Sequence, residues 1–257
     1  MFYFIGRPIS VYNLILIIAA VVPAVVLMVK VARADRLERE SPRLLARLVF
    51  AGILSALLAL VEERVLSAIL DRIVSEESPI YNVILYFVIV AGAEETSKYL
   101  LLHGNSWKSR QFNCQYDGVV YAVFVSLGFA LWENISYVLH YGFSTALVRA
   151  VTAIPGHACF GVFMGIAYGL AKRYHYRGEM GKVKMFRALA IVVPMLLHGT
   201  YDYLATIEEQ VYSWIFVGFV VVLFIVSYIL VHRMSKGDRY IDGSDQGAAD
   251  SDDIFGE

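Results

Sequence analysis

The sequence predicts an all-α fold, a polytopic transmembrane helix bundle of about seven spans, on the basis of its composition and its apolar runs. Of the 257 residues, 58% are hydrophobic and 18% are charged, which is not the composition of a soluble domain. A membrane-spanning helix needs about 20 mostly apolar residues. The candidate spans lie at about 11–31, 44–62, 80–103, 117–139, 146–171, 185–207 and 211–232.

Charge alternates between the predicted connections and gives an expected topology. The basic connections lie at 30–47, 106–115, 172–187 and 233–239. Because basic connections stay on the cytoplasmic side, we expect the N-terminus outside and the C-terminus in the cytoplasm. Residues 1–233 then form the transmembrane domain. Residues 234–257, rich in Asp, Gly and Ser, are predicted to be a disordered acidic cytoplasmic tail.

The sequence contains no nucleic-acid-binding motif, phosphate-binding loop or zinc finger, so we expect contact with the lipid bilayer and none with nucleic acid. It gives no indication of an oligomeric state. Val61–Ser75 contains the adjacent acids Glu62 and Glu63, but its apolar residues recur at helical spacing opposite the charges. We interpret it as an amphipathic segment lying on the outer interface.

The stretch Gly92–Lys98 is the centre of the functional prediction, because it places ionisable groups within an apolar span. Glu94 and Glu95 project about 100° apart on a helix, and Lys98 falls between them. A charge within a membrane costs roughly 3 kcal/mol on insertion scales, so such groups usually face a polar interior with partners. The alternative is a buried ion pair that only fixes helix packing.

Other spans carry polar residues that can share one cavity with this stretch. Glu133 lies on one helix face with two aromatic residues, and His198 and Asp202 are one turn apart. Individually, Glu133 can snorkel to the surface and His157 can be a satisfied core histidine. Together they predict a cavity that opens outward. The predicted site residues are Glu94, Glu95, Lys98, Glu133, His157, His198 and Asp202.

The chemistry of this set points to hydrolysis. A carboxylate in a dry cavity, with a cation beside it, can act as a general base towards water, and imidazole N–H groups can stabilise an oxyanion. The sequence shows no Ser-His-Asp or Cys-His constellation and no HExxH zinc motif. Two kinds of hydrolytic site then remain possible: one in which a glutamate activates water, and one in which scattered Glu and His side chains hold a metal ion.

Three motifs resemble those of one family. Glu94–Lys98 resembles the EExxK signature of the PrsW family of intramembrane proteases, Phe129–Glu133 its FxxxE motif, and His198–Asp202 its HxxxD motif. The resemblance covers roughly residues 80–207, with the motifs in order on separate spans. It also implies a distant relation to the CAAX prenyl endopeptidases.

The resemblance implies a multi-pass protease of the bacterial plasma membrane, with residues 1–233 as its protease domain. Its expected partner is a single-pass membrane protein substrate, such as an anti-sigma factor, cut near the outer face at the start of a signalling cascade. By analogy, Glu94 is the base, tuned by Glu95 and Lys98. Glu133 positions the water, and His198 with Asp202 forms the oxyanion side. A charged Asp202 would repel an oxyanion unless it is protonated or only orients His198.

No cofactor is expected, but three alternatives are open. The first is a zinc-dependent protease, with Glu95, Glu133, His157 and His198 as metal ligands. The second is an ion- or proton-coupled transporter in which the buried Glu and Lys groups form a relay. The third is an inactive scaffold that binds partners through a stripe of small residues, which is expected mainly to pack helices. The stripe consists of Gly161, Gly165 and Gly169.

Overall fold

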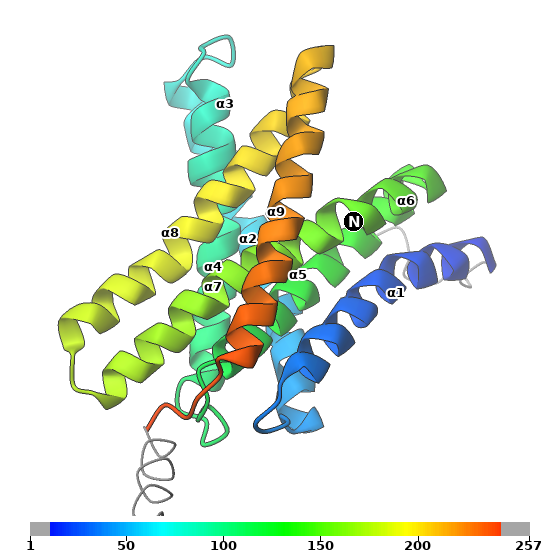
Figure 1. Cartoon of the computed structure of the whole chain (residues 1–257). Coiled ribbons are helices and arrows are strands. Elements are labelled where there is room, and N and C mark those ends of the chain that lie inside the picture. Colours follow the sequence, from blue (N-terminus) through cyan, green and yellow to red (C-terminus); the bar gives the residue numbers. More distant parts are fainter. Residues whose placement is uncertain (1–10, 243–257) are drawn as a thin grey trace, which may run out of the picture.

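The computed structural model describes residues 11–242, and these residues form a bundle of helices (Figure 1). Within them, the only β-type pairing is one isolated antiparallel bridge between Cys114 and Tyr240. The predicted all-α class is therefore confirmed for the described chain. The elements are α1 (Val11–Ala34), α2 (Pro42–Ile73), α3 (Tyr81–Val83), the π-helix η1 (Ile84–Val90), α4 (Ala91–Ser106), α5 (Asp117–Tyr141), α6 (Phe143–Val151), α7 (Ala153–Tyr176), α8 (Met180–Ala205) and α9 (Gln210–Lys236).

Several of these helices are long and apolar enough to cross a membrane. Among the described residues there are 5 such segments: α1, α2, α5, the pair α6–α7, and α9. The rod formed by α3, η1 and α4, and helix α8, do not meet the same criterion, and they carry most of the predicted site residues. The chain is a multi-pass membrane protein. Seven spans and an outside N-terminus remain predictions.

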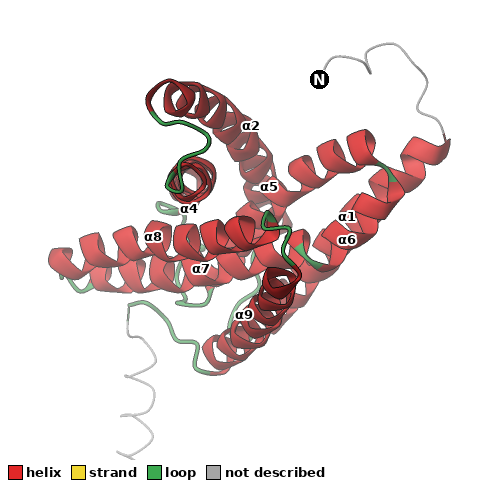
Figure 2. Cartoon of the chain, turned by 90° about the horizontal axis from the view of Figure 1, so that it is seen from above, coloured by secondary structure: helices red, strands yellow, loops and turns green. Residues whose placement is uncertain are grey.

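Helix α5 lies at the centre of the bundle. It packs against α1, α2 and α7, and every residue from Asp117 to Ala130 is buried. Helix α4 lies beside α2 and α8, as Figure 2 shows from above. The site helices α4, α5, α7 and α8 are thus neighbours, and α1 and α9 lie further out.

Small residues allow α5 and α7 to approach closely. A Cβ atom built on Gly165 would lie 2.5 Å from the backbone oxygen of Gly118, and one on Gly169 would lie 2.4 Å from that of Gln115. The glycine stripe is therefore a packing surface inside this chain, as expected. It is not available for a partner, so the scaffold interpretation based on it is wrong.

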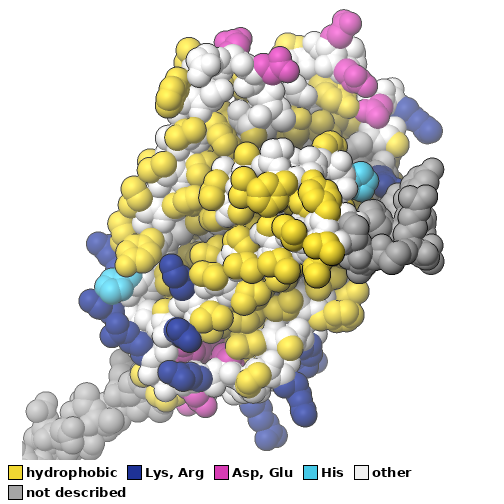
Figure 3. All heavy atoms as spheres, turned by 90° about the vertical axis from the view of Figure 1, so that its right-hand side faces the viewer, with side chains coloured by type: hydrophobic (Ala, Val, Ile, Leu, Met, Phe, Trp, Pro, Cys, Tyr) yellow, Lys and Arg dark blue, Asp and Glu magenta, His cyan; other side chains and the backbone are white. Residues whose placement is uncertain are grey.

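The outer faces of the bundle are apolar, as a lipid environment requires. Leu14 and Ile18 on α1 and Val222 and Ile225 on α9 are exposed. Figure 3 shows a hydrophobic band across one side of the molecule, with acidic side chains gathered at the upper end and basic ones towards the lower end. This separation agrees with the charge alternation used to predict the topology.

Three segments differ from the prediction. The span predicted at 146–171 is broken at Thr152, because Pro155 has no N–H to donate to the carbonyl of Val151 and the helix restarts as α7. The segment 61–75 is not a separate interfacial helix, since α2 runs continuously to Ile73.

The predicted tail at 234–257 also begins too early. Helix α9 continues to Lys236, and the next residues dock on the loop before α5. The Ile241 N–H donates to the Asn113 carbonyl at 2.7 Å, and the Ile241 side chain is buried. A buried isoleucine explains why this short acidic segment is held. The rest of the predicted tail, 243–257, lies outside the described residues.

Candidate active site

A buried lysine forms the centre of the site. Lys98 has no exposed surface, and its Nζ lies 3.1 Å from Glu94 Oε2 and 2.6 Å from Glu95 Oε1. The helical spacing of these residues on α4 brings both carboxylates to the ammonium, as predicted. The ring of Phe129, on α5, covers the ammonium at 4.0 Å. Ion pairing and the aromatic face together compensate for removing this charge from water.

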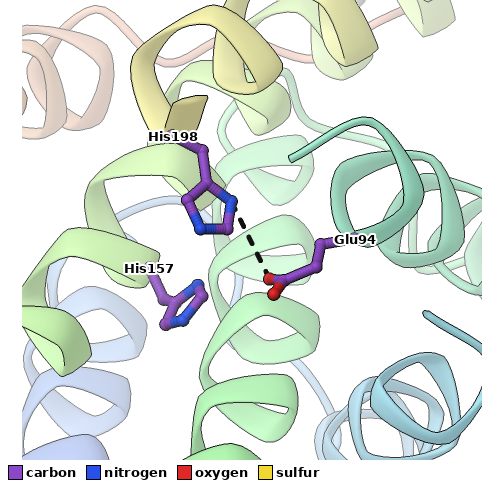
Figure 4. A group of neighbouring side chains, drawn as sticks. All are labelled: Glu94, His157 and His198. Atoms are coloured by element: carbon purple, nitrogen blue, oxygen red, sulfur yellow. Dashed lines mark ion pairs between the residues drawn. The ribbon is translucent and has the colours of Figure 1, made fainter. Parts of the chain in front are cut away.

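Two histidines from neighbouring helices complete the centre. Figure 4 shows His157 of α7 and His198 of α8 beside Glu94 of α4. The two rings lie 5.3 Å apart, and His198 Nδ1 lies 2.9 Å from Glu95 Oε1 and 3.8 Å from Glu94 Oε2. Helices distant in sequence therefore converge on one set of polar atoms.

The partners of His157 determine its tautomer. Its Nδ1 lies 3.1 Å from Lys98 Nζ, and its Nε2 lies 2.8 Å from Glu133 Oε2. Because an ammonium can only donate, Nδ1 accepts and the Nε2–H donates to Glu133. His157 is thus a neutral link between the lysine and the carboxylate on α5.

His198 has a different environment, because both of its ring nitrogens face carboxylates. Its Nε2 lies 3.3 Å from Asp202 Oδ2, and its Nδ1 faces Glu95. Phe160 stacks on the ring with centroids 4.7 Å apart. These contacts fix the orientation of the imidazole, so Asp202 is an orienting partner of His198.

An arginine that the sequence analysis did not select lies beside Glu133. Arg149 Nη2 is 2.9 Å from Glu133 Oε1, and its Nε donates to Asn134 Oδ1 at 3.0 Å. Its guanidinium lies 4.0 Å from the Tyr137 ring centre. The available signal was a single basic residue in the apolar stretch 146–154, which resembles an ordinary interfacial anchor.

A cavity of about 600 Å³ gives access to part of this network. Its wall includes Glu94, Glu133, His198, Asp202 and Arg149 and extends to the helix ends near His140 and Thr206. Glu95, Lys98 and His157 lie behind this wall and are almost fully buried. The structure thus brings all seven predicted residues together, with four of them on the cavity surface.

The acidic pair on α2 also belongs to this region, contrary to the prediction. Ser97 Oγ donates to Glu62 Oε2 at 3.0 Å, and Glu63 lines the cavity. The apolar residues of the same segment, such as Val65 and Ile69, are exposed. The helical pattern was correctly recognised, but its apolar side faces outward and its polar side faces the bundle.

One subset of the site has the donor atoms of a metal centre. Glu94, His157 and His198 each offer one ligand atom, all within 4.8 Å of one another. Two imidazoles and a carboxylate are a donor set that catalytic zinc uses, with a fourth position left open. In the zinc alternative, Glu95 and Glu133 were predicted as metal ligands beside the two histidines. The geometry favours Glu94 as the carboxylate ligand in their place.

Comparisons with known proteins agree with the three motifs. A family model described as "PrsW family intramembrane metalloprotease" matches residues 40–231. Protease PrsW of Clostridioides difficile (strain 630) is 30% identical over 226 residues, which cover 86% of this chain and 90% of that protein.

Two further relatives carry the same name. Protease PrsW of Geobacillus kaustophilus (strain HTA426) is 33% identical over 195 residues, 76% of this chain and 81% of that protein. Protease PrsW of Bacillus subtilis (strain 168) is 39% identical over 123 residues, 48% of this chain and 53% of that protein. No solved structure matches the chain.

Fold, site and relatives define the class of protein as a multi-pass membrane peptidase. The chain belongs to the PrsW family of intramembrane proteases. Family membership favours a protease over the transporter considered from the sequence.

Proposed function

We propose that the chain cleaves a single-pass membrane protein within the bilayer, using a water molecule activated by Glu94. The observation that carries this proposal is the orientation of the two adjacent acids on α4. Glu94 lines the cavity with His198 and Glu133, whereas Glu95 has no exposed surface and lies behind the wall. Only Glu94 is therefore placed to meet both water and substrate.

The proposed reaction is a general-base hydrolysis. Glu94 takes a proton from water, and the water oxygen bonds to the carbonyl carbon as the carbonyl electron pair moves to oxygen. When this intermediate collapses, the C–N bond breaks and the leaving nitrogen receives the proton from Glu94. One water molecule is consumed for each peptide bond cut.

The neighbouring residues position and stabilise the reacting groups. Lys98 bridges Glu94 and Glu95 and holds the base in place. Asp202 orients His198 and is not itself a partner of the oxyanion in this proposal. Repulsion between the Asp202 carboxylate and the oxyanion is therefore not an objection to its role. On the cavity wall, the guanidinium of Arg149 and the imidazole of His198 are suited to stabilise the developing negative charge.

A metal-dependent form of the reaction is the second candidate, supported by the donor set and by the description of the matching family. Glu94, His157 and His198 would hold the ion. When bound, zinc would supply a Lewis acid and lower the pKa of a coordinated water. In that form Glu133 keeps its hydrogen bond with the His157 Nε2–H as an orienting partner, whereas the ion would take the lone pair that now accepts from Lys98.

Two features support the substrate class. The cavity reaches the ends of α5 and α8 on the side that carries the acidic connections, which is the predicted outer side. A cut near that face suits a single-pass protein such as an anti-sigma factor. The named relatives are bacterial, which supports a place in the bacterial plasma membrane.

The test is co-expression with a tagged single-pass anti-sigma factor. Cleavage is expected with the wild type and with the control Glu76→Gln, an exposed acid that does not line the cavity. It should be lost with Glu94→Gln and with His198→Ala. Undiminished cutting by Glu94→Gln would disprove the assignment of the base.

Metal analysis separates the two candidates. Purified wild-type protein free of zinc that cuts the substrate in the presence of a strong chelator supports the metal-free reaction. Activity that is lost with the chelator and restored by zinc, together with about one zinc ion per chain, supports the second candidate.

A further inference from the structure

A second group of carboxylates lies at the opposite end of the bundle from the cavity mouth. Asp35 follows α1, Glu40 precedes α2, and Asp117 begins α5. One oxygen from each lies within 4.8 Å of the others. Asp117 and Glu133 are sixteen residues apart on α5, about 24 Å at 1.5 Å per residue. This acidic cluster is therefore separate from the active site.

Four carboxylate oxygens of the cluster are buried and lack hydrogen-bond partners. Asp35 is 7% exposed, and neither of its carboxylate oxygens accepts a hydrogen bond from a side chain. Asp117 has no exposed surface; its Oδ2 accepts from the N–H groups of Asn113 and Cys114 at 3.0 and 2.7 Å, and its Oδ1 is unbonded. Glu40 Oε2 is also buried and unbonded. Buried polar atoms normally have partners, so these oxygens indicate an absent ligand.

The cluster also lacks positive charge. Among residues 11–242, no lysine or arginine forms an ion pair with any of the three carboxylates. Three acids held this close in a poorly solvated place repel one another, and a cation would remove that cost.

An entry path reaches the cluster. A cavity of about 400 Å³ is lined by Asp35 and Glu40 together with apolar residues of α1 and α5. Arg33 and Arg39 also lie on this cavity wall, but neither forms an ion pair with the cluster. An ion from solvent can therefore approach two of the three carboxylates.

We propose that Asp35, Glu40 and Asp117 bind one divalent cation of the oxygen-preferring kind, Mg²⁺ or Ca²⁺. All three donors are carboxylate oxygens, the ligands that these ions select, and water completes their coordination. The absence of histidine and cysteine from the set disfavours zinc, which separates this site chemically from the Glu94, His157 and His198 set.

The position of the ion gives it a structural role. It joins the loop after α1 to the start of α5. Asp238, whose Oδ1 accepts from the Tyr116 N–H at 2.8 Å, lies beside the cluster and belongs to the docked C-terminal segment. Three segments distant in sequence are thus held together where the charges of their acids would otherwise drive them apart.

The experiment is thermal unfolding of the purified full chain in detergent after metal removal. MgCl₂ and CaCl₂ are titrated separately, with NaCl at matched ionic strength as the control for screening. The wild type should show a saturable rise in Tm with at least one of the two ions. Asp35→Asn should need at least tenfold more cation for the same rise, while Glu76→Gln and Glu94→Gln should respond as the wild type does.

A direct binding measurement complements the unfolding assay. Isothermal titration with the same ion should show about one site per chain, lost in Asp35→Asn. If that variant does not fold, Glu40→Gln replaces it, because Glu40 is only half-buried. The proposal is overturned if the wild type shows no saturable response to either ion, or if Asp35→Asn and Glu40→Gln respond equally with it. A wild type that ignores both ions while Asp35→Asn is more stable would show that the acids share protons instead.

Discussion

Replacing Lys98 by methionine tests the most enclosed interaction of the site. Methionine keeps the length and apolar stem of the side chain but removes the ammonium. The ammonium lies 3.1 and 2.6 Å from the Glu94 and Glu95 oxygens and 3.1 Å from His157 Nδ1. Its removal leaves two buried acids adjacent to each other without a cation.

The expected loss of stability is large. Removing one partner of a buried ion pair costs about 3–5 kcal/mol. At about 2–4 °C of Tm per kcal/mol for a domain of 150–250 residues, the Tm should fall by about 6–20 °C. Thermal unfolding in detergent measures this shift, and the cleavage assay should show loss of activity at temperatures where the variant is still folded.

Two comparisons make the result interpretable. Lys182→Met removes an ammonium 2.6 Å from Glu179 Oε2, but both side chains are exposed, so the Tm should scarcely change. Adding Glu95→Gln to Lys98→Met should restore part of the lost stability, because it removes one of the uncompensated charges. The reasoning is refuted if Lys98→Met melts at the same temperature as Lys182→Met.

Further predictions concern the cavity, the helix packing and the metal. If the guanidinium stabilises the oxyanion, Arg149→Ala should lower the rate of cleavage about 10²–10³-fold, as the loss of other oxyanion donors does. Arg149→Lys should retain more activity than Arg149→Ala. Equal cleavage rates for the wild type and Arg149→Ala would contradict this role. Gly165→Ala should lower the Tm, because the added Cβ would lie 2.5 Å from the Gly118 backbone oxygen. Gly104→Ala should keep or raise the Tm, because a Cβ added there would meet no neighbouring atom within 4 Å. A higher Tm for Gly165→Ala than for the wild type would count against the close approach of α5 and α7. A strong chelator should leave the rate of cleavage unchanged if Glu94 activates water without a metal. Cleavage that is lost with the chelator and restored by zinc would instead support the zinc-dependent reaction.

The parts of the site that could be predicted are those in which charge occurs inside an apolar run. Glu94, Lys98, Glu133 and His198 stood out because the bilayer penalises such residues wherever they have no partners. Helical spacing then placed Lys98 between the two acids of α4. Both arguments need only local sequence, and the structure agrees with them.

The remaining features depend on how each helix is rotated about its axis, which tertiary packing determines. Glu94 and Glu95 differ by one position, and only the contacts of α4 with α2 and α8 decide that Glu94 faces the cavity. The same holds for Glu63, whose helix shows its polar face to the bundle. Arg149 lies on the short helix α6, which ends at the break at Thr152, and its side chain lines the cavity.

The π-helix η1 explains how that rotation is set in the rod that carries the acids. A π turn contains an additional residue, so it shifts the angular phase of the α4 residues relative to those of α3. Phe87 within it packs where Gly199, next to His198, has no side chain. If the same residues wound as an ordinary α-helix, Tyr81 would turn by about 100° relative to Glu94. The phase of the acids is thus adjusted by a single additional residue, and an insertion here should affect activity more than a substitution does.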